Sequence, residues 1–254
     1  MTLGLPRPLQ RVARPFVGTS ANYIGGNIDS SYLTHPDYAP DRNQLVRAQG
    51  VLEQDLSRLF DYVEPADRNR HAYSHRIFSQ LGRASMEVEA LLSSSLRAAG
   101  VGKGRPDMRD YKRLNGPLKL SEYRVRLTIW EGEQKEFFPF ESWSRGESPK
   151  WWDNYNQSKH DRLEKFDKAT LLAATHATGA ALVCLFSQLA GLAMDCSSDA
   201  FSCYLTTGDD WIVGNSLFAL KPPSWLETEK YGFTKEQDHG KRLEQDVPPL
   251  APRQ

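Results

Sequence analysis

The stretch from Ala169 to Met194 constrains the fold of this chain more than any other feature, because its 26 residues include no Asp, Glu, Lys or Arg. A segment of this length can cross a bilayer as one helix, and a helix that is apolar on all sides can also occupy the centre of a soluble bundle. The polar side chains of Thr170, His176 and Gln188 and the lack of Trp or Tyr at either end favour the buried helix. We therefore expect a buried helix with His176 as a hydrogen-bonded core residue, and a single-pass membrane protein is the alternative.

The rest of the chain divides into three parts. Residues 1–40 are rich in Pro, Gly, Asn and Ser without sustained periodicity, which predicts an irregular N-terminal arm. Residues 41–193 are expected to form a helical bundle, because apolar residues recur at three- and four-residue steps over 41–63 and 73–99. Residues 194–254 are expected to form an acidic, partly irregular C-terminal extension.

A small β-hairpin is expected to interrupt the helices near residues 123–140. Apolar and polar residues alternate over 123–129, which is typical of a half-buried strand, and 137–140 can pair with it. A further strand is expected within 211–220. The fold class is therefore mainly α: a helical bundle with a small β-hairpin insertion and irregular N- and C-terminal extensions.

The composition excludes some classes of function. Lys and Arg number 32, as do Asp and Glu, so attraction of a polyanion by the whole protein is excluded, although a local basic patch is not. Cys184, Cys196 and Cys203 are too few for a disulfide framework, which indicates a cytoplasmic protein and leaves a Cys196–Cys203 bridge open. The cysteines do not have four-ligand zinc spacing, and we expect neither a metal nor a cofactor.

Cationic side chains gather at the predicted start of the second helix. Residues 68–76 contain three Arg and two His, and donors at a helix N-terminus can bind a phosphate. The alternative is that these residues solvate the helix start, with Ser74 or Asp67 as its cap. The candidate substrate-binding residues in this cluster are Arg68, Asn69, His75 and Arg76.

A second polar cluster, residues 151–162, is the part of the chain richest in Trp, Asn, Lys and His. If these residues continue as one helix, one face carries Trp152, Tyr155, Asn156, Lys159 and either Leu163 or Arg162. Asn156 and His160 would lie one turn apart, as would Tyr155 and Lys159, and such a ladder of amide, ammonium and imidazole groups can orient a phosphate.

A structural role for the second cluster is the alternative. Glu87 and Glu89 fall within the apolar stripe of the second helix, and a carboxylate buried without a partner is costly. Lys159 and His160 would then bind an internal carboxylate such as that of Glu87, and the three side chains would form a buried Glu-Lys-His network. In that case the protein is a non-enzymatic scaffold that binds other proteins.

The two clusters together resemble a group of uncharacterised bacterial proteins that carry a Tyr-Asn-x-x-Lys-His-Asp-Arg signature and are similar to the HEPN superfamily of helical bundles. The resemblance covers roughly residues 41–192. It rests on the helix that starts Tyr73-Ser74-His75-Arg76 and carries Glu87 and Glu89, on Tyr155-Asn156-Gln157-Ser158-Lys159-His160-Asp161-Arg162, and on the long apolar helix after them.

Membership of that superfamily implies an RNA-binding homodimer that cleaves RNA without a metal, in a bacterial defence or toxin-type system. A His would act as acid and base and an Arg would hold the phosphate. Tyr155 stands where the superfamily has its Arg, so Lys159 or Arg162 would supply the cation. The catalytic residues implied are Asn156, Lys159, His160 and Arg162, and the second wall of the site would be Arg68, Asn69, His75, Arg76 and Tyr155.

Overall fold

The computed structural model describes Val12, Gly104 and residues 41–98, 106–189, 205–206, 211–213 and 217–230. The expected N-terminal arm, apart from Val12, and both Cys196 and Cys203 lie outside the described residues. Within them the protein is mainly helical with a small antiparallel sheet, which confirms the expected fold class.

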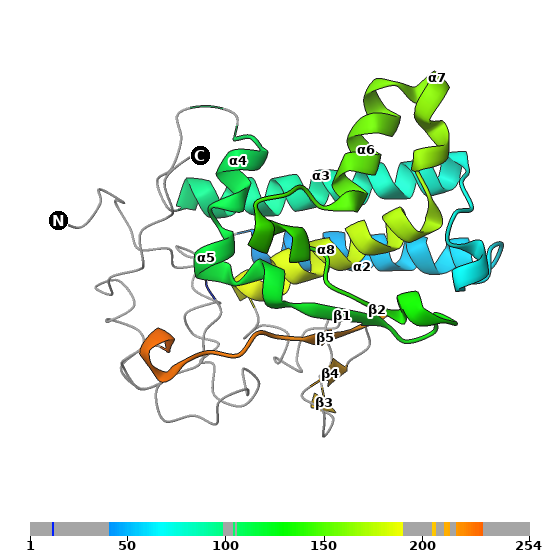
Figure 1. Cartoon of the computed structure of the whole chain (residues 1–254). Helices are drawn as coiled ribbons and strands as arrows, with labels where there is room; N and C mark the ends of the chain where they lie inside the picture. The colour runs from blue at the N-terminus through cyan, green and yellow to red at the C-terminus, as the bar shows by residue number, and fades with distance from the viewer. Residues whose placement is uncertain are drawn as a thin grey trace.

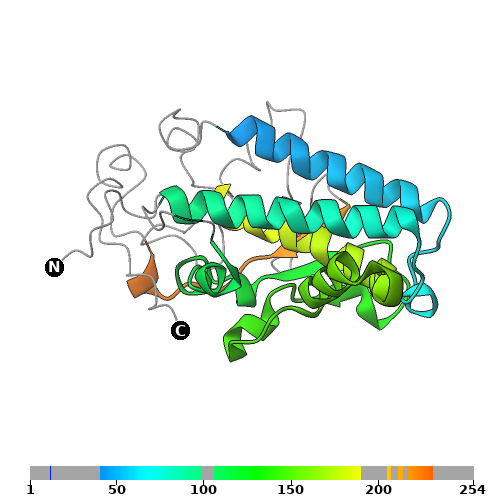
Figure 2. The same cartoon turned by 90° about the horizontal axis from the view of Figure 1, so that it is seen from above.

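Three long helices form the body of the protein: α2 (Arg42–Phe60), α3 (His75–Ala98) and α8 (Leu171–Leu189). The antiparallel pair α2 and α3 lies side by side (Figure 2). Helix α8 lies between this pair and the sheet (Figure 1), and its most extensive packing is against α3. The shorter helices are α4 (Met108–Lys112), α5 (Asn115–Leu118), α6 (Lys150–His160) and α7 (Arg162–Lys165), and the 3₁₀ helices span Asp67–Asn69, Leu120–Glu122, Glu133–Lys135, Glu141–Arg145, Phe166–Lys168 and Glu227–Glu229.

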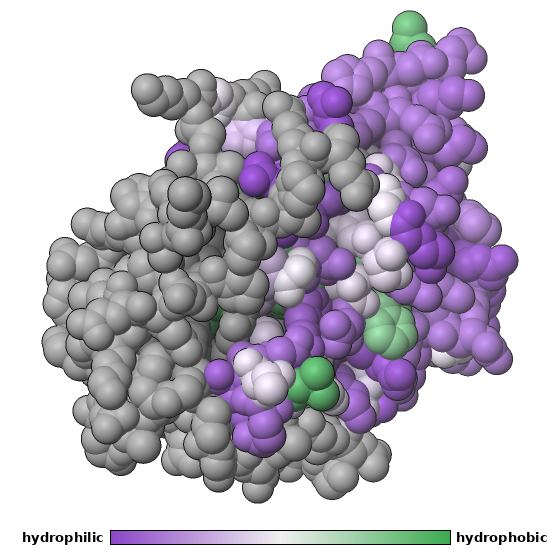
Figure 3. All heavy atoms as spheres, turned by 60° about the vertical axis from the view of Figure 1, so that its left-hand side comes forward, coloured by the Kyte–Doolittle hydropathy of each residue, from purple (hydrophilic) through white to green (hydrophobic). Residues whose placement is uncertain are grey.

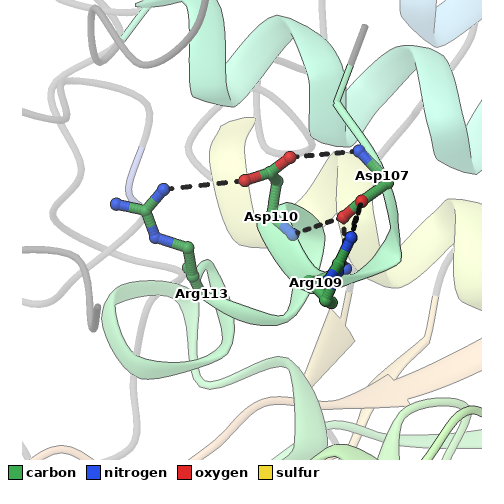
Figure 4. Close-up of polar contacts among 4 residues, drawn as sticks. All are labelled: Asp107, Arg109, Asp110 and Arg113. Atoms are coloured by element: carbon green, nitrogen blue, oxygen red, sulfur yellow. Dashed lines mark hydrogen bonds and ion pairs between the residues drawn. The ribbon is translucent and has the colours of Figure 1, made fainter. Parts of the chain in front are cut away.

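The starts of α2, α3 and α4 show how local polar groups set the helix ends. Ser74 Oγ accepts a hydrogen bond from the Ile77 amide at 3.2 Å, so Ser74 caps α3. Asp41 stands at the N-cap position of α2 but makes no side-chain capping bond. Asp107 and Asp110 form a reciprocal capping box at α4 (Figure 4), and the hydrogen bond from Arg109 is the main reason that the pKa of Asp107 falls to about 2.

Helix α8 is buried along its whole length, with only Leu172 and His176 half-buried. It is long and apolar enough to cross a membrane, but 89% of its apolar stretch is buried inside the protein. Its polar groups bond within the bundle: Gln80 Nε2 of α3 donates to Thr178 Oγ1 at 3.1 Å and to the Leu52 carbonyl of α2 at 2.9 Å. The expectation of a buried helix therefore matches its position in the protein.

The sheet has the strand order β2-β1-β5-β4-β3, and all its pairs are antiparallel. The expected hairpin forms, since Val125 pairs with Phe137. The single strand expected within 211–220 is instead two short strands, β4 and β5, that pair with each other, and β5 also pairs with β1. The strands are β1 (Arg124–Leu127), β2 (Glu136–Phe137), β3 (Leu205–Thr206), β4 (Ile212–Val213) and β5 (Phe218–Lys221).

Candidate functional site

The second polar cluster does not continue as one helix. Asp161 has φ −130° and ψ 62°, outside the helical region, so α6 ends at His160 and Arg162 begins the separate helix α7. The expectation of one continuous helix through Arg162 is therefore wrong, and neither Leu163 nor Arg162 extends the face of Tyr155 on α6. The α6–α7 unit projects from the body beside the start of α3 (Figure 1), and the part of the described surface that rises highest in Figure 3 is almost entirely hydrophilic.

The break in the helix brings the two polar clusters together. Arg162 Nη2 donates a hydrogen bond to His75 Nδ1 at 3.0 Å. The same guanidinium lies over the rings of Phe78, at 5.0 Å, and Phe166, at 5.8 Å. The imidazole of His75 packs on Phe166 with the ring centroids 4.8 Å apart. We call this group of His75, Phe78, Arg162 and Phe166 the corner site.

The contact between Arg162 and His75 fixes the tautomer of the imidazole. A guanidinium has five N–H donors and no acceptor, so Nδ1 of His75 must accept. The proton of the neutral ring then resides on Nε2, which becomes a hydrogen-bond donor. The corner site thus presents an imidazole N–H next to a guanidinium, and both side chains are exposed. This pair of groups can bind a phosphate oxygen.

Backbone hydrogen bonds hold the corner site in place. The Leu171 amide donates to the Ala72 carbonyl at 2.8 Å, and the Leu172 amide donates to the Arg70 carbonyl at 3.1 Å. Tyr73 also forms an isolated bridge with Thr170. The segment before α3 is therefore tied to the first turn of the buried helix α8.

The other candidate residues of the first cluster, Arg68, Asn69 and Arg76, are not part of the corner site. Arg68 forms an ion pair with Glu131 at 3.3 Å, and Asn69 Nδ2 donates to the Glu64 carbonyl at 3.0 Å. These contacts hold the 3₁₀ helix and its loop, so neither side chain is directed by them to the corner site. Arg76 is exposed and forms no ion pair within the described part of the chain, which leaves it available to an anion.

Helix α6 presents the remaining candidates beside α3. Tyr155 is buried and packs against Trp152, with Lys159 Nζ 5.0 Å from the centre of the tyrosine ring. Asn156 is half-buried, and His160 is exposed at the last residue of α6. Tyr155 is thus a packing residue. Its buried ring contacts the ammonium group of Lys159 and is not open to a ligand.

The buried network of Glu87, Lys159 and His160 does not form among the described residues. Lys159 and His160 are exposed, and Glu87 instead lines a groove between α2 and α3. Burial raises the pKa of the Glu87 carboxyl, which is half-buried there. Glu89 is also half-buried. An apolar stripe in the sequence does not show whether a helix face is buried in the core or lines such a groove, because both kinds of face carry apolar side chains.

Sequence reasoning missed the aromatic part of the corner site. Phe166 contacts Tyr73, His75 and Phe78, although it was not among the candidate residues. The apolar helix α8 starts five residues after Phe166, because Ala169, at ψ 68°, leaves the helical region. Phe166 lies between Lys165 and Lys168 and four residues after Arg162, and an aromatic residue close to cations was the available signal.

Comparison with known proteins adds no assignment. The chain matches no protein-family model, and it shows no significant similarity to any curated protein or solved structure. In addition, no group of three or more His, Cys, Asp or Glu side chains in the described ranges could hold a metal ion. Membership of the HEPN superfamily therefore stays a prediction.

Proposed function

We propose that the protein binds RNA at the corner site. The observation that carries the proposal is the 3.0 Å contact between Arg162 and His75, which joins two basic clusters 87 residues apart over a shared aromatic base. A guanidinium holds a phosphate by paired hydrogen bonds, and aromatic rings and arginine planes hold bases. Zero net charge fits a local patch of this kind.

The proposal extends to cleavage without a metal, in a bacterial defence or toxin-type system. A ribose 2′-hydroxyl would attack the adjacent phosphorus while an imidazole accepts its proton, and the 5′-oxygen would leave with a proton from an acid. His160 is the acid-base residue that the HEPN resemblance implies, with Asn156 and Lys159 beside it on α6. Arg162 would hold the phosphate. A cytoplasmic location and a homodimer belong to the same proposal.

The test compares two variants that each remove one exposed arginine, one inside the corner site and one outside it. Purified protein is incubated with total RNA in the presence of a chelator, and binding is measured at a fixed salt concentration. Arg162→Ala is expected to weaken binding by about tenfold, as loss of a charge-assisted contact does. Arg97→Ala removes another exposed arginine, in the last turn of α3, and should bind as the wild type does.

His160→Ala separates binding from cleavage. The side chain is exposed, so this variant is expected to fold and bind RNA while it loses cleavage. If the wild-type protein binds RNA without cleaving it, the cleavage proposal is wrong and RNA binding alone remains. Equal affinity of the wild type and Arg162→Ala would contradict the corner site.

A second candidate function, binding of another protein, is favoured by the groove between α2 and α3. The groove has a volume of about 680 Å³. Its apolar residues include Val51, which is 39% exposed, and Met86, which is 54% exposed, and Arg47 and Glu87 also line it. An amphipathic helix with a Lys for Glu87 and a Glu for Arg47 fits these features.

A synthetic peptide of that design tests the second candidate. Titration followed by NMR is expected to shift the amide signals of α2 and α3, and Met86→Glu should abolish the shifts because it places a charge on the apolar contact surface. RNA binding should not change in Met86→Glu. An absence of shifts in the wild type would exclude this kind of partner.

A further inference from the structure

Tyr73 is an exposed aromatic residue that neither the fold nor the phosphate contacts of the corner site require. Tyr73 is 54% exposed although its segment is tied to the first turn of α8. The ring meets Phe166 edge-on, with the centroids 5.8 Å apart and the planes at 89°. In this geometry the edge of one ring is covered while much of the tyrosine surface stays open to solvent.

The position of Tyr73 is fixed before any ligand arrives. Its backbone bridges to Thr170, and the neighbouring Ala72 carbonyl accepts from the Leu171 amide at 2.8 Å. A ring on such a segment loses little conformational freedom when a planar ligand stacks on it, because the backbone is already ordered. The exposed ring is thus a preorganised surface for a flat, apolar group.

Tyr73 and the guanidinium of Arg162 have a common neighbour, the ring of Phe166. The centre of that ring lies 5.8 Å from the Tyr73 ring centre and 5.8 Å from Arg162 Cζ. A phosphate held by Arg162 would therefore place its attached ribose and base within reach of Tyr73. Bases inside a duplex have their faces covered by neighbours, whereas unpaired bases can stack on a protein ring.

We infer that Tyr73 stacks an unpaired base of a single-stranded RNA whose phosphate is bound at Arg162. The inference rests on the proposed function and adds to it the class of nucleic acid and the residue that selects it. Single strands are bound because their bases are open, and duplex RNA is discriminated against for the same reason.

The experiment measures fluorescence anisotropy of a labelled oligouridine, of the same strand with its bases removed, and of a duplex. Tyr73→Ala is expected to bind the oligouridine about tenfold more weakly than the wild type, and Tyr73→Phe to bind as the wild type does, since the ring face is what stacks. Tyr62→Ala is the matched control, because Tyr62 is 88% exposed and has no part in the corner site. The abasic strand should bind wild type and Tyr73→Ala equally.

The outcomes separate this inference from the proposed function. A wild type that binds none of the three ligands overturns both. Binding of oligouridine by the wild type and Tyr73→Ala with equal affinity overturns the stacking role while RNA binding stands. A tenfold loss that persists on the abasic strand also overturns it, because the ring would then act on the backbone. Tyr73→Leu retains an apolar contact with Phe166 and replaces Tyr73→Ala if circular dichroism shows that the alanine variant is unfolded.

Discussion

Asp67 organises the loop that follows β1. Its carboxylate accepts hydrogen bonds from Trp130 Nε1 at 2.8 Å and from the amides of Glu133 at 2.7 Å and Gln134 at 3.1 Å. These bonds, that from Trp130 first, hold the pKa of Asp67 below its ordinary value. Asp67 therefore serves the loop and not the cap of α3, which was one of its expected roles.

Gly132 permits this arrangement, and its replacement should be costly. It has φ +118° and ψ −165°, a region essentially restricted to glycine, and a Cβ there would lie 2.4 Å from Asp67 Cγ. Gly132→Ala is expected to lower the free energy of unfolding by about 1–3 kcal/mol, measured by urea denaturation. Gly116→Ala is the control, because a Cβ at this exposed glycine of α5 meets nothing within 4 Å. Equal effects of the two substitutions would contradict the role of Gly132.

His176 differs from the expected hydrogen-bonded core residue. Its ring stacks on Phe137, with the centroids 4.0 Å apart, and its buried Nε2 has no hydrogen-bond partner in the described part of the protein. Burial lowers the pKa of His176 from 6.5 to about 4. The folded protein thus keeps the imidazole neutral under conditions in which the unfolded chain protonates it.

This lowered pKa predicts how stability depends on pH. The unfolded state binds the proton first, so the contribution of His176 to stability is intact above pH 6.5 and is lost as the pH falls toward about 4. The loss amounts to at most about 3 kcal/mol. His176→Phe retains a ring against Phe137 and cannot titrate. Urea denaturation of both proteins at neutral pH and near pH 4 should therefore show a smaller acid loss in the variant, and equal losses would refute the assignment.

At the scale of elements, the contact between α8 and the sheet depends on a glycine. A Cβ at Gly179 would lie 2.8 Å from Phe137 Cζ and 3.3 Å from Val125 Cγ1. Phe137 is itself held by its stack on His176, so it has little room to move. The absence of a side chain at Gly179 therefore allows the strands β1 and β2 to pack closely on the helix.

Gly179→Ala should destabilise the protein although alanine favours helices. The gain in helix propensity is about 1 kcal/mol, and overpacking of a core costs about 1–3 kcal/mol, so a net loss and a lower Tm are expected. Gly82→Ala is the matched control within α3, since a Cβ there lies 4.0 Å from Tyr155 Cε2 and fits. It should raise the Tm. A rise in both variants would show that the helix and sheet can separate without cost.

The elements differ in how far the sequence could predict them. Apolar periodicity was sufficient for α2 and α3, because one face of each is buried along its length. The break at Asp161 and the late start of α8 could not be predicted, since they depend on contacts with distant residues: Leu171 bonds to Ala72, and Arg162 bonds to His75. The strand β5 likewise needs a partner, β1, that precedes it by about ninety residues.

At the scale of the whole molecule, the sequence indicated which side chains carry chemistry and not which of them meet. His75 and Arg162 were both candidates, and only the fold places them 3.0 Å apart. Arg68 had the same chemical character, but the fold directs it to Glu131. Which side chains of the two clusters contact each other depends on the path of the chain between the clusters. No local sequence pattern predicts that path.

The segment 217–230 is attached to the helical body at both ends. Before β5, the Leu217 amide donates to Glu53 Oε2 of α2 at 2.9 Å. After β5, Lys119 Nζ donates to Glu229 Oε2 at 2.7 Å and to the Ser224 carbonyl at 2.9 Å, and it also lies over the Trp225 ring at 4.8 Å. The C-terminal strand is thus joined to the bundle by polar contacts as well as by its pairing with β1.

Lys119→Met tests whether the two attachments act independently. Methionine keeps an apolar stem against Trp225 but removes the charge, so the attachment after β5 should weaken by about 1–2 kcal/mol. Hydrogen exchange should then quicken for the amides of 224–230, while Leu217, held by Glu53, and the amides of α3 exchange as in the wild type. Faster exchange throughout 217–230 and β1 would instead mean that the segment and the sheet open as one cooperative unit, with Lys119 as its anchor.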